Sequence, residues 1–156
     1  KENLFEGCKK LTRIRLPSTI KQISKHSFSK CTSLIEVSFA KGMELEKIDD
    51  YAFFYCISLQ KLSLIPNTCK VIGNRAFEGC SSLKDIQFDD IDFLETIGKY
   101  AFDGTLIKKS IKESKNAIRL ITTEQDSDAI NLPFFKRVNN ESNDTYKVMI
   151  KVHMHQ

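Results

Sequence analysis

The sequence predicts a solenoid, in which short repeats stack side by side and each repeat adds one strand to a parallel β-sheet. Three observations support this prediction. Phenylalanine recurs at intervals of 23 to 25 residues, as Phe5, Phe28, Phe53, Phe77 and Phe102. A small side chain, cysteine in four repeats and threonine in the fifth, follows three residues after each phenylalanine. An L-x-x-L-x-L spacing of apolar residues then begins three residues later in the first four repeats.

The strand of each repeat is expected at the L-x-x-L-x-L segment, at residues 11–16, 34–39, 59–64 and 83–88. A period of about 24 residues with this spacing is typical of a leucine-rich repeat solenoid, with one short strand per repeat. A single repeat cannot bury its own apolar face, so stacking must close a continuous core. The third apolar position is therefore expected to point inward in each of these repeats, as Leu16, Phe39, Leu64 and Phe88.

The return segment of each repeat carries an apolar pair, eight and five residues before the next phenylalanine. These pairs are Ile20 and Ile23, Leu45 and Ile48, Cys69 and Ile72, and Leu94 and Ile97. We expect irregular, short helical or β return segments here. The repeats differ in length only between the strand and this pair, where Pro17, Gly42 and Pro66 mark surface turns.

The repeat pattern divides the chain into two parts. Residues 1–106 are expected to hold about four to five repeats, the first of them truncated. Residues 107–156 are expected to hold a degenerate last repeat and a small β-containing C-terminal cap. Lys109 takes an apolar position there, and a polar outer face suits a capping repeat. The alternation of apolar and polar residues over 145–156 predicts a strand.

The stretches "IDDYAFFYCISLQKLSL" (48–64) and "IGNRAFEGCSSLKDIQF" (72–88) share the order Ile, Ala-Phe, Cys, Leu and a second apolar pair. This order resembles the BspA-like leucine-rich repeats of surface and adhesion-type proteins in bacteria and parasitic protists. The resemblance covers residues 4 to about 106. It implies adhesion, protein binding and a cell-surface or secreted location, with host or extracellular matrix proteins as partners, and it brings no catalytic residues.

The cysteines are predicted to be structural core thiols, at Cys8, Cys31, Cys56, Cys69 and Cys80. A free cysteine packs as a small hydrophobic residue. Threonine takes the same position in the fifth repeat, as Thr105, which favours a packing role over a reactive one. Disulfides and a zinc site are the alternatives. Equivalent side chains in a parallel stack point the same way, which is poor geometry for a disulfide. The sequence contains no C-x-x-C or C-x-H pair, whereas zinc sites usually bring two ligands within a few residues of each other.

The outward side of the predicted sheet is the first candidate binding face. Its first column alternates in charge, and its second column is polar and mostly neutral. The face consists of Arg13, Glu36, Lys61 and Asp85 in the first column and Arg15, Ser38, Ser63 and Gln87 in the second. Neighbouring strands lie about 4.8 Å apart, so each charge faces its opposite. Two interpretations are open for this face. Either its side chains pair only with one another and so fix the register of the strands, or they form a groove for an extended polar partner.

A second candidate is an edge column two residues before each later phenylalanine, made of His26, Tyr51, Arg75 and Tyr100. These side chains are expected to stack along one edge of the solenoid. Such a column can bind a sugar or peptide ring by stacking. Alternatively, it serves only as an amphipathic cover for the core.

The location of the protein has two interpretations. Asn140 and Asn143 begin tandem N-glycosylation sequons, which suit a secreted protein. Unpaired cysteines suit the reducing cytoplasm, where the same repeats would act as an intracellular scaffold. The sequence begins inside a repeat, so its first residues do not decide between the two.

Several function classes are not supported by the sequence. It carries no nucleophile motif, phosphate loop or metal-ligand pattern, so we expect no enzyme activity, cofactor or metal. No apolar run approaches the 18 residues or so that a membrane helix needs. Residues 1–30 hold 8 basic and 2 acidic residues, whereas residues 31–106 hold 7 basic and 12 acidic residues. A nucleic-acid partner would require one continuous basic stripe, so other proteins are the expected partners, and the oligomeric state stays open.

Overall fold

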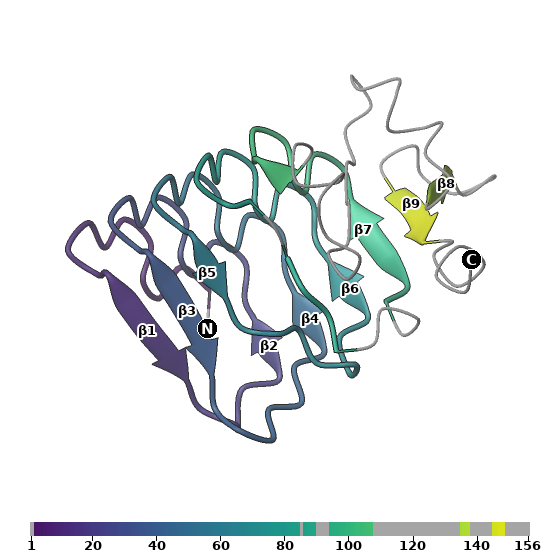
Figure 1. The fold of residues 1–156 in the computed structure, drawn as a ribbon, viewed down its shortest axis with the longest axis horizontal. Coiled ribbons are helices and arrows are strands. Elements are labelled where there is room, and N and C mark those ends of the chain that lie inside the picture. Colours follow the sequence, from purple (N-terminus) through teal and green to yellow (C-terminus); the bar gives the residue numbers. More distant parts are fainter. Residues whose placement is uncertain (1, 85, 90–93, 108–134, 138–144, 149–156) are drawn as a thin grey trace.

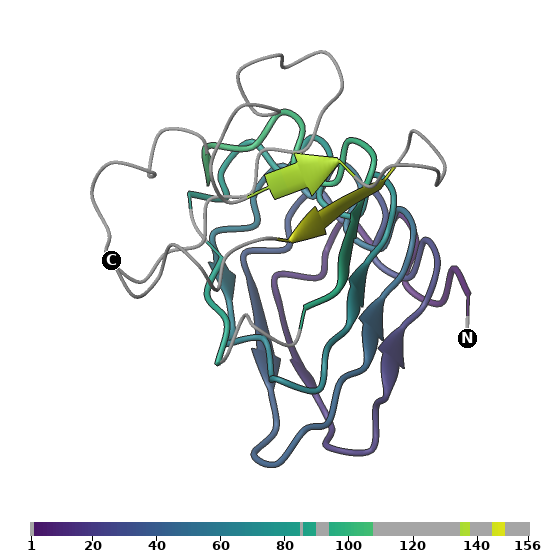
Figure 2. The same cartoon turned by 90° about the vertical axis from the view of Figure 1, so that its right-hand side faces the viewer.

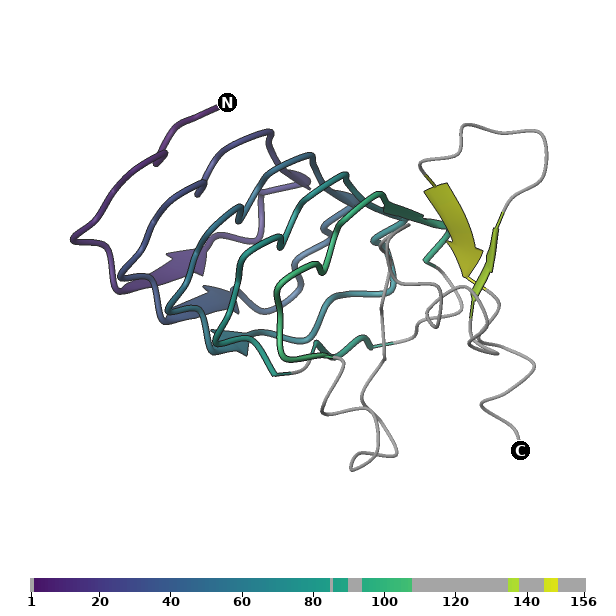
Figure 3. The same ribbon diagram turned by 90° about the horizontal axis from the view of Figure 1, so that it is seen from above.

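The computed structural model describes residues 2–84, 86–89, 94–107, 135–137 and 145–148. The chain winds into a β-solenoid with two parallel sheets as its walls (Figure 1). Figure 3, seen from above, shows the turns of the solenoid side by side along the stack. This architecture confirms the predicted solenoid.

The first sheet is built from the predicted strand segments. It contains β1 (Arg13–Leu16), β3 (Glu36–Phe39) and β5 (Lys61–Leu62), paired in that order and parallel. Arg13 faces Glu36, and Glu36 faces Lys61, so equivalent repeat positions are in register. Among the described residues, the fourth predicted segment joins this sheet through one bridge, between Ile65 and Phe88.

The second sheet is built from the return segments. It contains β2 (Gln22–Ile23), β4 (Lys47–Ile48), β6 (Val71–Ile72) and β7 (Thr96–Gly98), all parallel. Beyond β7 the sheet continues antiparallel with β9 (Thr145–Val148) and then β8 (Phe135–Arg137). Seen along the stack in Figure 2, the two sheets form opposite walls, with β8 and β9 near the viewer. Strand β9 begins where the alternating pattern predicts a strand.

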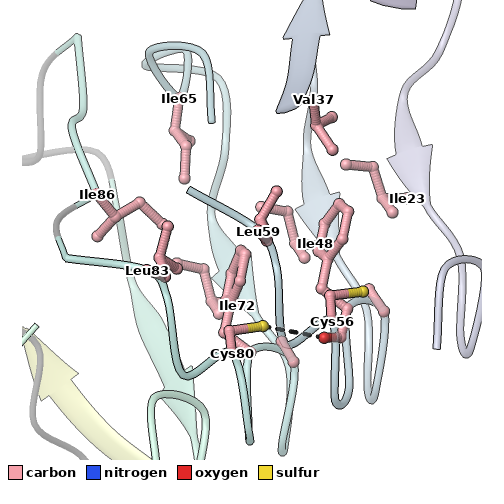
Figure 4. Packing of buried hydrophobic residues seen from close by; sticks show 14 of the residues in the cluster. Ile23, Val37, Ile48, Cys56, Leu59, Ile65, Ile72, Cys80, Leu83 and Ile86 are labelled. Carbon is pink, nitrogen blue, oxygen red and sulfur yellow. Dashed lines mark hydrogen bonds between the residues drawn. The ribbon is translucent and has the colours of Figure 1, made fainter. Parts of the chain in front are cut away.

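The core lies between the two sheets. Its centre is a stack of phenylalanine rings, one per repeat, with neighbouring centroids 5.2 to 5.3 Å apart and planes within 13° of parallel. The stack consists of Phe5, Phe28, Phe53, Phe77 and Phe102. Figure 4 shows the aliphatic and cysteine side chains that pack around it from both walls. Each repeat thus buries its apolar face only against its neighbours.

Two residues in each turn have a left-handed backbone conformation. One lies two residues before the stacked phenylalanine, with φ between 56° and 59°, in Asn3, His26, Tyr51, Arg75 and Tyr100. The other lies two residues after it, with φ between 55° and 78°, in Gly7, Lys30, Tyr55, Gly79 and Gly104. Glycine adopts this conformation freely, whereas a side chain with a Cβ carries strain. Five of the positions in the first set and two in the second hold such a residue, so the fold imposes this turn geometry regardless of sequence.

Two other glycines allow close approach between layers. An added Cβ on Gly73 would lie 2.5 Å from the backbone nitrogen of Asp50, and one on Gly98 would lie 2.4 Å from that of Asn74. At these points the preceding layer is held by side-chain hydrogen bonds. The Asn74 N–H donates to Asp50 Oδ1 (2.7 Å), and the Lys99 N–H donates to Asn74 Oδ1 (2.8 Å).

One strand departs from the predicted pattern. Leu64 was expected to point into the core, but 48% of its surface is exposed, whereas the next residue, Ile65, is fully buried. The prediction for Leu64 is wrong because the pairing slips by one residue after Ser63. A one-residue slip exchanges the two faces of a strand.

Candidate functional site

The first column of the candidate binding face is partly paired within the protein. Arg13 Nε lies 3.4 Å from Glu36 Oε2, with 67% and 37% of the two side chains exposed. Lys61 follows in register on the other side of Glu36 and is exposed. Asp85, the fourth member, lies outside the described residues. The register therefore places opposite charges on neighbouring strands, and Arg13 and Glu36 form an ion pair there.

The second column uses its hydroxyl groups to hold the sheet together. The Phe39 N–H donates to Ser63 Oγ (3.1 Å), and Ser38 Oγ lies 3.5 Å from the carbonyl oxygen of Ile14. Arg15 and Gln87 are exposed at the two ends of this column. The two serines therefore have structural partners, and only the ends of the column present polar groups to a ligand.

The edge column lies on the turns that follow β2, β4, β6 and β7, with one residue on each turn. The His26 and Tyr51 rings are stacked, with centroids 4.7 Å apart and planes within 15°. The Arg75 guanidinium lies 4.4 Å from the centroid of the Tyr100 ring, a cation–π geometry. Arg75 also donates to Glu78 Oε2 (2.7 Å), and this hydrogen bond raises the pKa of Arg75. All four side chains are half-buried, so the column is ordered but accessible.

Two aromatic residues extend this column that the sequence analysis missed. Phe54 meets Tyr51 edge to face at 5.2 Å, and Tyr55 meets Phe54 in the same way at 4.5 Å. The Tyr55 ring lies over Gly79 of the next repeat, where an added Cβ would come within 2.9 Å of it. Tyr55 is nevertheless 46% exposed. The sequence does mark these two aromatic residues, in "AFFYC" (52–56). In the other repeats, the two positions between the phenylalanine and the cysteine or threonine hold polar or small residues.

The thiols form a ladder inside the stack. Each of three cysteines donates its S–H to the carbonyl oxygen of the phenylalanine in the preceding repeat, at 3.0 to 3.1 Å. The donors are Cys31, Cys56 and Cys80, and the acceptors are Phe5, Phe28 and Phe53; the last bond is the dashed line in Figure 4. The cysteine therefore fills space and also satisfies a carbonyl of the neighbouring layer. Thr105 at the fifth rung bonds within its own repeat, to the Phe102 carbonyl oxygen (2.7 Å).

Burial makes these thiols poor nucleophiles. It raises the pKa of Cys31 and Cys56, raises that of Cys80 strongly, and raises that of Cys69 to about 11. A thiol is reactive as its thiolate, which burial disfavours. All five cysteines are free, and Cys8 in the first repeat is only half-buried. The ladder is thus suited to packing rather than to redox or acyl-transfer chemistry.

The described part of the chain contains no cluster of three or more His, Cys, Asp or Glu residues that could hold a metal ion. Among the same residues, no helix is long and apolar enough to cross a membrane. Asn140 and Asn143 lie outside the described residues, so their modification stays a prediction, as does the boundary between repeats and cap at residue 106.

Comparison with family models finds one match, to the BspA type leucine-rich repeat region, in six copies over residues 1–126. The chain belongs to the BspA-type leucine-rich repeat family. Repeats of this family form scaffolds for protein interaction. Comparison with curated proteins gives no match.

Solved structures show the same fold. A T. pallidum leucine-rich repeat protein matches 65% of this chain with 34% identity and a TM-score of 0.59. A leucine-rich repeat protein from Eubacterium ventriosum matches 67% with 24% identity and a TM-score of 0.59. A leucine-rich cell surface protein from Faecalibacterium prausnitzii matches 93% with 18% identity and a TM-score of 0.50, a likeness that shows the fold alone. This chain covers 47%, 27% and 47% of those three chains, respectively.

Proposed function

We propose that this BspA-type solenoid is an adhesion module that binds proteins of a cell surface or matrix through its edge column. The observation that carries the proposal is the ordered set of rings and guanidinium at His26, Tyr51, Arg75 and Tyr100. Tyrosine and arginine are the residue types that most often dominate binding energy in protein interfaces. Side chains that are already stacked lose little rotamer freedom on binding, which favours affinity.

The sheet face is the weaker candidate because its groups already have partners. A ligand there would have to desolvate the Arg13–Glu36 pair, and Ser63 is engaged in a hydrogen bond. Burying charges that gain no new partner opposes binding. The edge column also contains an internal ion pair, between Arg75 and Glu78, but its stacked rings offer aromatic contact area that requires no ion pair to open.

The alternative function is an intracellular scaffold built on the same repeats. The observation that favours it is the set of five free cysteines, four of which are buried. Disulfides form and persist in oxidising compartments, whereas free thiols are the normal state in the cytosol. The two functions differ in where the partner is found and not in the binding surface.

The test is a binding assay with two sources of partner. The chain, tagged at its C-terminus, is incubated separately with solubilised matrix and cell-surface proteins and with cytosol of the source cell. The test variant is Tyr51→Asn with Tyr100→Asn, because asparagine tolerates the left-handed conformation of these positions. The control is Arg15→Gln with Lys61→Gln on the sheet face, where both side chains are exposed.

We expect saturable binding of a surface or matrix protein that the edge variant weakens about tenfold and the sheet-face variant leaves within about twofold. Enrichment from cytosol alone would replace adhesion by the scaffold function. Binding that the sheet-face variant abolishes and the edge variant leaves intact would contradict the edge column as the site.

A further inference from the structure

The slip in the first sheet exposes an apolar side chain beside a recess. Leu16 pairs with Phe39 across β1 and β3, and Leu64 would be the next in register. Ile65 instead takes the inward position and is fully buried, as Figure 4 shows, while Leu64 is 48% exposed. Irregularities of this kind re-aim side chains and are over-represented beside functional sites.

The backbone hydrogen bonds show where the strand pairing in the first sheet is interrupted. The Ser63 N–H donates to the Val37 carbonyl oxygen (3.0 Å), which is the last regular bond between the two strands. The Ile65 N–H then turns to the next repeat and donates to the Gln87 carbonyl oxygen (2.9 Å). Between them, the N–H and carbonyl of Leu64 have no backbone partner within the residues that the structure describes. The strand that carries Leu64 has β3 on one side and the fourth repeat on the other, so this break is a local opening within the sheet.

A recess of about 400 Å³ adjoins this break, past the carboxyl ends of β3 and β5. We call it the Leu64 recess. Its apolar lining comes from Phe39, Met43, Leu64 and Pro66, and its charged lining from Lys41 and Asp89. Both charged side chains are exposed, and neither has an ion-pair partner at 4.0 Å or less among the described residues. An apolar recess with separate opposite charges fits an apolar side chain that has an acidic and a basic neighbour.

We propose that the Leu64 recess binds an extended segment of a partner protein, with one apolar side chain placed beside Leu64. The segment carries an acidic residue toward Lys41 and a basic residue toward Asp89. The apolar contact with Leu64 supplies affinity, and the opposite charges of Lys41 and Asp89 supply selectivity. This inference rests on the proposed function as a protein-binding module. It adds a second contact at the opposite ends of the strands from the edge column.

The test uses an array of short, end-blocked peptides. Each peptide has a central leucine between two valines, and its two outer positions are Glu, Lys or Ser in every combination. We expect the strongest binding from peptides with Glu on one side and Lys on the other. Leu64→Ser should weaken that binding about tenfold, and Lys41→Glu should change the preferred residue on one side from Glu to Lys.

The matched control is Ile57→Ser, which removes an apolar side chain of similar exposure, 43%, from the turn edge. It should leave peptide binding unchanged, and circular dichroism should show both serine variants folded, since each residue removed is exposed. Equal binding of all charge arrangements, no saturable binding of any peptide, or binding unaffected by Leu64→Ser would overturn the proposal.

The outcomes also separate this proposal from the adhesion function. If the array selects peptides as expected but the extracts yield no specific partner, the recess stands and the adhesion function fails. If a surface protein binds equally well to the chain and to its Leu64→Ser variant, and the array shows no selection, the adhesion function stands and the recess fails.

Discussion

The buried stacks and the exposed columns of this solenoid follow the same period, but they contribute differently to stability and to binding. Inside, the rings of Phe28, Phe53 and Phe77 stack at nearly constant spacing, and the thiols repeat one hydrogen bond from layer to layer. Outside, the first column of the sheet face changes residue at every step, as in Arg13, Glu36 and Lys61. The interior must fit a neighbouring copy of the same layer, so it tolerates little variation. The exterior must fit only water or a partner, so its variation is where binding specificity can reside.

The comparison predicts that stability resides in the inner columns. Phe53→Ala should have the largest effect, because it removes a ring stacked on both sides and leaves a cavity in the middle of the stack. We expect a loss of about 3 to 5 kcal/mol in the free energy of unfolding, measured by urea denaturation. Phe54→Ala is the matched control, since this adjacent ring is half-buried and belongs to the outer cluster. Equal losses from the two variants would remove the distinction between inside and outside.

The second prediction concerns the spacing between layers. Gly73→Ala places a Cβ 2.5 Å from the Asp50 backbone nitrogen, so the layers must move apart. We expect a loss of about 3 kcal/mol in the same urea assay. The control is Gly42→Ala, where φ is +79° but nothing lies within 4 Å of the added Cβ, and where about 1 kcal/mol is expected from strain alone. A Gly42 variant that is less stable than the Gly73 variant would show that backbone strain outweighs layer contact.

Most of the repeating architecture could be predicted from the sequence. The phenylalanine and cysteine positions are set by a period that is visible in the chain, and the structure places them in stacks. The second parallel sheet was only one of several forms expected for the return segments. Two apolar residues per segment, such as Leu45 and Ile48, specify burial but not strand pairing, which forms only when neighbouring layers align.

The features that escaped prediction are local conformations that the fold imposes on unsuitable residues. Tyr51, Arg75 and Tyr55 adopt a left-handed conformation for which their side chains give no sequence signal. The exposure of Leu64 was missed because Leu64 and Ile65 are adjacent and both apolar, so either residue could serve as the inward one. The choice between them depends on hydrogen bonds from Phe39 and to Gln87, which lie a full repeat away.

The third prediction uses the protonation of an inner thiol. Burial raises the pKa of Cys69 to about 11 from 9.0, its ordinary value. Above pH 9 the unfolded chain loses this proton while the folded chain keeps it, so stability falls as pH rises from 9 toward 11. Compared with Cys69→Val, which does not titrate, the wild type should lose about 1.4 kcal/mol per pH unit in that window. Urea denaturation under reducing conditions measures the difference in unfolding free energy between the wild type and Cys69→Val. This difference should be constant between pH 7 and 8. If it is still unchanged at pH 10, Cys69 is not a buried neutral thiol.

The smallest effect is expected on the sheet face, where the Arg13–Glu36 pair is largely exposed. A double-mutant cycle with Arg13→Gln and Glu36→Gln should give a coupling energy below about 1 kcal/mol. The coupling should shrink further at high salt, because the charges are screened. A larger coupling energy that salt does not change would show that this outer column stabilises the fold, as the inner stacks do. A small, salt-sensitive coupling leaves these positions free to vary at little cost in stability, the condition under which a repeat surface can acquire a partner.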